Sequence, residues 1–308
     1  MFLALLSSFA LSTSAAGCEA HNDAVNAAAD VVEARYVIAD EGRVIADQLR
    51  AWSRDGRYRQ PCDDSAGFMS QLNRDLDGWD GHFFFERQSD SADVAAQDWL
   101  SAWRAEARTV NAGVREARVL EGNIGYVRIS SWYPWDSAGP KLHAALALVA
   151  DVDGLIIDLR GNGGGDAATV SHLMRALAPS SIDAVQSIAR RDAEQPEPLP
   201  EAELPRIRET LPLAILVDRR SASASEYLAY SLQALDRAVV IGGRSGGVAS
   251  MIGEPVALPN GFAIAVPEAR PVNLITRGNW EADGVRPDHS GGDDPVHVAR
   301  RHLEHSGA

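Results

Sequence analysis

The chain has 308 residues, and its 29 basic and 43 acidic side chains give a formal net charge of −14. At about 150 residues per domain, this length suits two domains or one large one. A 45% hydrophobic fraction excludes a largely disordered protein. An acidic chain is poorly suited to binding phosphate backbones, so we expect no nucleic-acid partner. Lys141 is the only lysine.

The N-terminus has the pattern of an export signal. Residues 1–12 form an apolar run that is too short to span a bilayer, and small residues follow at 13–17. We therefore expect residues 1–17 to be a signal peptide, with the mature protein periplasmic, secreted or attached to the cell envelope. The alternative is a buried N-terminal helix. Cys18 either carries a lipid, which would be the sole membrane link, or forms a disulfide with Cys62.

Residues 20–110 are predicted to be mostly helical, because apolar side chains recur there at three- and four-residue spacing. One short aromatic stretch interrupts this pattern and has the composition of a strand. The helices are expected over residues 24–37, 41–52, 66–76 and 92–108, and the strand over residues 81–85.

From residue 112 onward, apolar strands alternate with helices. Continuous apolar strands separated by helices are typical of a mostly parallel sheet that is covered on both faces. We expect residues 192–206 to be a surface loop, residues 253–275 to hold a strand pair, and the last histidines to lie in a polar tail. The strands are expected over 124–129, 154–159, 213–217 and 239–241, and the helices over 138–150, 167–177 and 223–235.

A glycine-rich loop, Asp158 to Asp166, joins a predicted strand to a predicted helix. Glycines at such a point let backbone N–H groups converge on an anion. A phosphate-binding loop would need Gly-Lys-Ser/Thr, and this loop has no lysine. The loop is therefore either part of an oxyanion hole or a tight structural turn.

A serine-rich segment, Asp218 to Glu226, repeats the strand–loop–helix arrangement. A serine at a helix start lies near the positive end of the helix dipole, and the next N–H can bind an oxyanion. The alternative is that Ser221, Ser223 or Ser225 simply caps the helix.

A nucleophilic serine needs a base, and the chain has eight histidines. His82 stands out because it follows Asp80-Gly81 where the helical region meets the rest, a position that favours a cleft. His143 and His172 fall within predicted sheet-covering helices. Glu281 can orient a histidine or be a solvated loop carboxylate. Histidines and carboxylates show no zinc-ligand spacing, so we expect no metal and no cofactor.

Taken together, these segments resemble the C-terminal processing (tail-specific) serine peptidase family over residues 112–290. The best-known branch uses a lysine about 25 residues after the serine, where this chain has Val248. The chain instead resembles the lysine-free branch of the tricorn protease core and bacterial relatives of interphotoreceptor retinoid-binding protein. The matching motifs are Asp80-Gly81-His82-Phe83 and Asn279-Trp280-Glu281-x-x-Gly284-Val285. The tricorn core has a serine where this chain has Gly81.

The resemblance implies an α/β (α+β) fold: a helical cap over residues 20–110 that ends in the His82 strand, then a ClpP/crotonase-like core over 112–305 with a mostly parallel sheet, and no PDZ domain. It also implies a Ser-His-Glu mechanism in place of Ser-Lys. The implied catalytic residues are Ser223, His82 and Glu281, and the implied oxyanion hole is the N–H of Ala224 with that of Gly163 or Gly164.

Three functions fit the sequence. The first is an exported serine peptidase that hydrolyses peptides or unfolded proteins. The second is a non-catalytic binding module for an apolar ligand or peptide, and the third is a structural envelope protein with a degenerate site. The joint presence of Ser223, His82 and Glu281 favours the peptidase, because a carrier needs none of them. The sequence predicts no oligomeric state.

Overall fold

A computed structural model describes residues 14–58, 60, 63–88 and 92–306. Most of the predicted signal peptide, and any bond between Cys18 and Cys62, therefore lie outside the described residues. Contacts divide the chain into two compact units. The helical unit comprises residues up to 90 together with 190–193 and 250–270, and the sheet unit comprises 91–189, 194–249 and 271–308.

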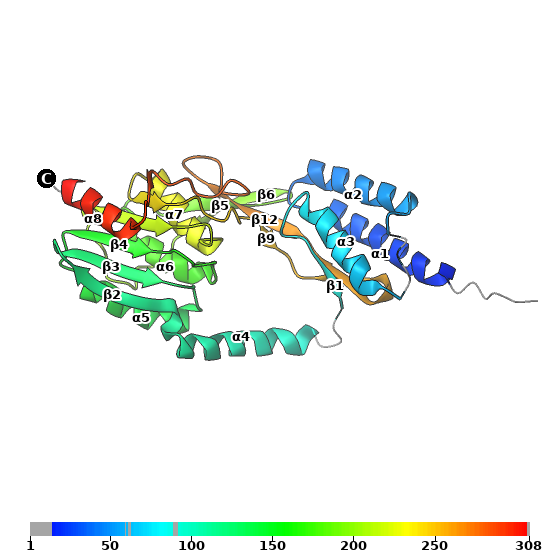
Figure 1. The fold of residues 1–308 in the computed structure, drawn as a ribbon, viewed down its shortest axis with the longest axis horizontal. Coiled ribbons are helices and arrows are strands. Elements are labelled where there is room, and N and C mark those ends of the chain that lie inside the picture. The colour runs from blue at the N-terminus through cyan, green and yellow to red at the C-terminus, as the bar shows by residue number, and fades with distance from the viewer. Residues whose placement is uncertain (1–13, 59, 61–62, 89–91, 307–308) are drawn as a thin grey trace, which may run out of the picture. The chain divides into compact units, whose positions relative to one another are not determined.

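The helical unit packs three helices against a small antiparallel sheet (Figure 1). The strands follow the order β1-β11-β10, so a segment near residue 85 pairs with one near residue 264. The elements are α1 (Ser14–Arg35), α2 (Ala39–Arg54), α3 (Ser65–Asp77), β1 (Phe84–Arg87), β10 (Val256–Leu258), η2 (Pro259–Gly261) and β11 (Phe262–Ala265).

Aromatic side chains form the centre of this unit. Phe68 of α3 contacts Phe85 and Phe262 edge-on, with ring centroids 5.5 and 5.4 Å apart. Period-two alternation buries Phe83 and Phe85 and leaves Phe84 52% exposed. The strand begins at Phe84, later than predicted, because the preceding residues form a turn.

The sheet unit is built on a six-stranded sheet of order β13-β8-β7-β4-β3-β2. The prediction of a mostly parallel sheet is confirmed, because only the β2–β3 pair is antiparallel. The strands are β2 (Val114–Leu120), β3 (Ile124–Ile129), β4 (Gly154–Asp158), β7 (Leu213–Val217), β8 (Val239–Gly242) and β13 (His289–Ser290).

Helices cover both faces of this sheet (Figure 1). On one face lie α5 (Trp135–Leu148), α6 (Ala167–Leu177) and α7 (Ala224–Ala234), and on the other lies α8 (Pro295–Ser306). The expectation of a polar tail was wrong, because α8 buries Ala299 and Leu303 against the sheet. Its polar composition reflects a helix with a single apolar stripe.

A four-stranded sheet of order β6-β5-β12-β9 contains a strand within the predicted 192–206 loop. That strand was missed because it is an exposed edge strand rich in charge and proline, where proline is tolerated. The strands are β5 (Ala184–Arg190), β6 (Ala193–Pro198), β9 (Met251–Ile252) and β12 (Pro267–Asn273).

The observed division differs from the predicted boundary near residue 110. Helix α4 (Ala92–Thr109) and the short η1 (Asn111–Gly113) belong to the sheet unit. Residues 250–270 belong to the helical unit, because β10 and β11 form one sheet with β1. Of the helices described, none is both long and apolar enough to cross a membrane.

Candidate active site

Ser223 forms a sharp turn between β7 and α7. Its φ of 54° and ψ of −120° lie outside the extended region usual for a helix N-cap. Such a conformation costs about 1–3 kcal/mol in a residue with a side chain and persists only where its surroundings hold it. The neighbouring serines have structural partners: the Ser221 hydroxyl donates to the Leu159 carbonyl at 2.8 Å, and the Ser225 hydroxyl accepts from Trp132 Nε1 at 2.9 Å. The capping position is Ser223.

The Glu226 side chain stabilises this turn. Its fully buried carboxylate accepts hydrogen bonds from the backbone N–H of Ser223 at 2.8 Å, Gly247 at 2.7 Å and Val248 at 2.9 Å, and from the Ser245 hydroxyl. Burial raises the pKa of Glu226, and these four donors oppose the rise. We assigned Glu226 no role from the sequence, although the Ser-x-x-Glu spacing is that of a capping box.

The glycine loop lies directly against Ser223. A Cβ at Gly164, where φ is +108°, would stand 2.9 Å from Cβ of Ser223 and 3.3 Å from the nitrogen of Ala224. The N–H of Gly164 donates to Asn162 Oδ1 at 3.0 Å and is therefore engaged. Among the described residues, we find no acceptor for the N–H of Gly163 or of Ala224. Of the two predicted glycines, Gly163 has the available donor.

Asn162 ties the loop to its surroundings. Its side chain is fully buried, and Nδ2 donates to the Ile129 carbonyl of β3 at 3.1 Å. Its own carbonyl accepts from the N–H of Ala222 at 3.0 Å, next to Ser223. One residue therefore fixes the glycine loop relative to both β3 and the serine turn.

The carboxylate of Asp158, at the end of β4, is held by hydrogen bonds from neighbouring side chains. Its buried carboxylate accepts from the Tyr126 hydroxyl at 2.7 Å and from two guanidinium nitrogens of Arg160 at 2.9 and 2.5 Å. Burial alone would raise the pKa of Asp158, but the hydrogen bonds from Arg160 and Tyr126 hold it below its usual range. This strand-end motif anchors the start of the glycine loop.

Glu281 belongs to the same network as Glu226. One carboxylate oxygen accepts from the N–H of Ala249 at 2.8 Å, and the neighbouring Trp280 donates from Nε1 to the Val248 carbonyl at 2.7 Å. The consecutive N–H groups of Val248 and Ala249 thus bind the two carboxylates. The backbone at Val248, where the lysine-dependent branch has its base, links the two acids.

His82 lies in the turn before β1 of the helical unit, beside a carboxylate. Its Nδ1 is 2.7 Å from Asp80 Oδ1, which also accepts from the His82 backbone N–H at 2.9 Å. The Tyr36 hydroxyl donates to Asp80 Oδ2 at 3.1 Å. Burial alone would raise the pKa of Asp80, but its hydrogen bonds with His82 and Tyr36 hold it below its usual range. We gave Asp80 no role, although the Asp-x-His spacing was visible.

The predicted site residues are thus divided between the units. Ser223, Ala224, the two loop glycines and Glu281 belong to the sheet unit, and His82 belongs to the helical unit.

Two other histidines, His21 and His172, pack against aromatic rings. His21 stacks on Phe68 with ring centroids 4.1 Å apart, and His172 stacks on Trp135 at 3.8 Å. Burial lowers the pKa of both histidines. Lys141 is exposed on α5.

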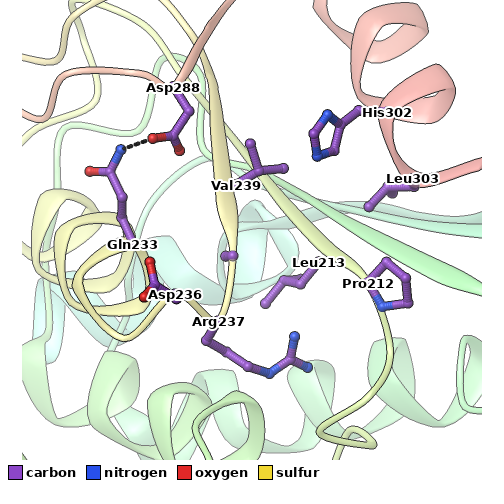
Figure 2. A pocket seen from close by; sticks show the side chains of 10 residues that line it. Pro212, Leu213, Gln233, Asp236, Arg237, Val239, Asp288, His302 and Leu303 are labelled. Carbon is purple, nitrogen blue, oxygen red and sulfur yellow. Dashed lines mark hydrogen bonds between the residues drawn. The ribbon is translucent and has the colours of Figure 1, made fainter. Parts of the chain in front are cut away.

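A cavity of about 390 Å³ opens beside the starts of β7 and β8 (Figure 2). It lies by Gln233, at the opposite end of α7 from Ser223. Two of its charged groups have hydrogen-bond partners in the fold: Asp288 accepts from Gln233 and from the Val240 N–H, and Arg237 donates to three backbone carbonyls. This arrangement supports the packing of the strand starts.

The amino-acid sequence is similar to those of known peptidases. The model of Peptidase family S41 matches residues 123–290, which include both the glycine loop and Ser223. The chain is 31% identical over 147 residues to the chloroplastic C-terminal processing peptidase of Tetradesmus obliquus. It is 26% identical over 187 residues to the carboxy-terminal processing protease CtpB of Bacillus subtilis (strain 168). These matches cover 48% and 60% of this chain but only 31% and 37% of the relatives.

Solved structures share the fold. A lipoprotein from Streptococcus agalactiae has a TM-score of 0.62 at 16% identity, with 99% of this chain and 100% of that chain covered. A protein from Parabacteroides merdae scores 0.68 at 19% identity, with 92% and 96% covered. The photosystem II D1 C-terminal processing protease scores 0.52 at 19% identity, with 90% and 94% covered. The α/β fold prediction is confirmed, and because the family match spans more than half of the sequence, the chain belongs to peptidase family S41.

Proposed function

We propose that the protein is an exported serine peptidase that hydrolyses peptide bonds in peptides or unfolded proteins. In this proposal Ser223 is the nucleophile, His82 is the base and Glu281 stabilises the protonated base. The N–H groups of Ala224 and Gly163 bind the oxyanion. The observation that supports it best is the strained backbone of Ser223 at a strand–turn–helix junction, with an unengaged N–H on the next residue.

The chemistry is acyl transfer in two steps. Nε2 of His82 takes the proton from the Ser223 hydroxyl as its oxygen attacks the substrate carbonyl carbon. The C–N bond then breaks, the proton passes to the leaving amine, and water hydrolyses the resulting ester by the same route. Loss of one oxyanion donor is expected to cost about 3 kcal/mol of transition-state stabilisation. The mechanism requires the two units to bring His82 to Ser223.

The curated relatives are named as C-terminal processing enzymes, which supports a peptide or protein substrate. The apolar run at residues 1–12 and the small residues after it support export through a signal peptide. The proposal also includes one of two states for Cys18, which either carries a lipid or forms a disulfide bond with Cys62.

Hydrolysis of an unfolded protein such as fluorescently labelled casein tests the function. We expect Ser223→Ala to lower kcat/KM at least about 1,000-fold, because no other group replaces the attacking oxygen. Ser101→Ala is the matched control, since it removes an exposed serine from α4 and is expected to keep full activity. Full activity in a correctly folded Ser223→Ala variant would contradict the proposal.

A further inference from the structure

Asp80 contacts the proposed base, His82, directly. Asp80 Oδ1 meets both the backbone N–H and the Nδ1 of His82, at 2.9 and 2.7 Å. The residues are two positions apart and form a closed turn within the helical unit. The Asp80 side chain is only 6% exposed, so its geometry is set by the protein rather than by solvent.

Asp80 is itself held from its other side. The Tyr36 hydroxyl donates to Oδ2 at 3.1 Å, and the Tyr36 ring stacks on Phe83 with centroids 5.3 Å apart. Both oxygens of the carboxylate therefore have donors, and the donor on Oδ2 comes from the connection between α1 and α2. Tyr36 is 4% exposed, so the protein interior surrounds this contact.

An ionised carboxylate can only accept hydrogen bonds. Its contact with His82 is therefore favourable when Nδ1 carries the proton, which leaves the lone pair of neutral imidazole on Nε2. That is the tautomer in which a histidine can take a proton from a serine through Nε2. The geometry thus selects the protonation pattern that a general base needs.

We propose that Asp80 is a positioning residue that fixes the tautomer and ring orientation of His82, with Tyr36 holding Asp80 in place. This inference rests on the proposed function, in which His82 is the base. Glu281 then acts on the charge of the protonated base, and Asp80 sets which nitrogen is free.

The tautomer can be measured without any substrate. Long-range ¹H–¹⁵N correlation spectra of the full chain at mildly alkaline pH distinguish Nδ1–H from Nε2–H histidine. The signals of His82 are assigned as those that are absent from the spectrum of His82→Gln. We expect Nδ1–H in the wild type and in Glu281→Gln. In Asp80→Asn we expect a shift toward Nε2–H, because the amide can donate to Nδ1. An Nε2–H tautomer in the wild type, or an unchanged tautomer in Asp80→Asn, would overturn the proposal.

Kinetics supply the second measurement. Asp80→Asn is expected to lower kcat by about 10³- to 10⁴-fold with little change in KM, because it perturbs the base and not substrate binding. Tyr36→Phe keeps the Asp80 carboxylate and is expected to lower kcat only about 10-fold. This milder variant still tests the proposal if Asp80→Asn does not fold. A wild type that hydrolyses nothing would reject the proposed function, whereas the tautomer result would still decide the Asp80–His82 pairing.

Discussion

The turn that holds Ser223 and the turn that holds His82 are stabilised in different ways. Ser223 is fixed through its backbone: the Glu226 carboxylate accepts its N–H, and the glycine loop packs against its Cβ. His82 is held through its side chain as well as its backbone, because both its Nδ1 and its N–H meet the Asp80 carboxylate two residues away. The serine turn therefore depends on small residues and on a buried carboxylate that accepts backbone N–H groups, whereas the histidine turn includes a side-chain pair, Asp80 with His82. Substitutions at the two turns should therefore have different effects on stability and activity.

Glu226→Gln is expected to have the largest effect on the serine turn. A glutamine offers one acceptor oxygen and places an NH₂ group among four donors, so at least one buried donor loses its partner. We expect the free energy of unfolding to fall by about 3 kcal/mol and kcat/KM by at least about 100-fold. Urea denaturation and casein hydrolysis measure the two effects. Glu201→Gln, at an exposed position, is the control, and an equal effect of both variants would contradict the role of Glu226.

Gly164→Ala tests the contact between the glycine loop and Ser223. The added methyl group would meet Cβ of Ser223 at 2.9 Å, at a backbone φ of +108° that alanine rarely adopts. We expect kcat/KM to fall roughly 10- to 100-fold, because a small displacement of the nucleophile is costly. Gly243→Ala is the matched control, since nothing lies within 4 Å of its Cβ position. Wild-type activity in Gly164→Ala would show that the loop is not tightly packed there.

Asp158→Asn should affect stability and its pH dependence. The pKa of Asp158 is lowered in the folded protein, so its contribution is present above the unfolded value of about 4 and is lost as pH falls through the folded value. At neutral pH we expect the variant to lose about 2 kcal/mol, and the loss to shrink in acid. Urea titrations between pH 3 and 7 measure this. Asp151→Asn, at an exposed position, is the control.

The sequence predicted the apolar strands and the helices between them because a buried parallel sheet leaves a continuous hydrophobic signal. It did not predict β6, because an exposed edge strand has the composition of a loop. It missed the covering role of α8, whose apolar stripe is carried by few residues such as Ala299 and Leu303.

The roles of Asp80 and Glu226 were missed for a different reason. Both lie within motifs that the sequence made visible, but a carboxylate's role depends on which donors surround it in space. The choice between Gly163 and Gly164 likewise depended on the side chain of Asn162, which takes the Gly164 N–H. Sequence order identified the segments, and only the folded geometry assigned the hydrogen bonds.

Lys141→Ala is expected to have the smallest effect. Lys141 is exposed on α5, and the proposed base is His82 and not a lysine. The rate of serine labelling by a fluorophosphonate probe should change by less than about twofold. Loss of labelling in a folded Lys141→Ala variant would favour a serine–lysine mechanism and reject His82 as the base.

In the proposed mechanism, Ser223 is an activated nucleophile and His82 is its base. Intact-mass analysis after treatment with a fluorophosphonate probe can detect such a serine without any knowledge of the substrate. We expect a single adduct on the wild type that maps to Ser223, and no adduct on Ser223→Ala or His82→Ala, with unchanged circular dichroism in all three. An adduct that persists in folded Ser223→Ala, or a folded wild type that takes no label, would contradict this mechanism.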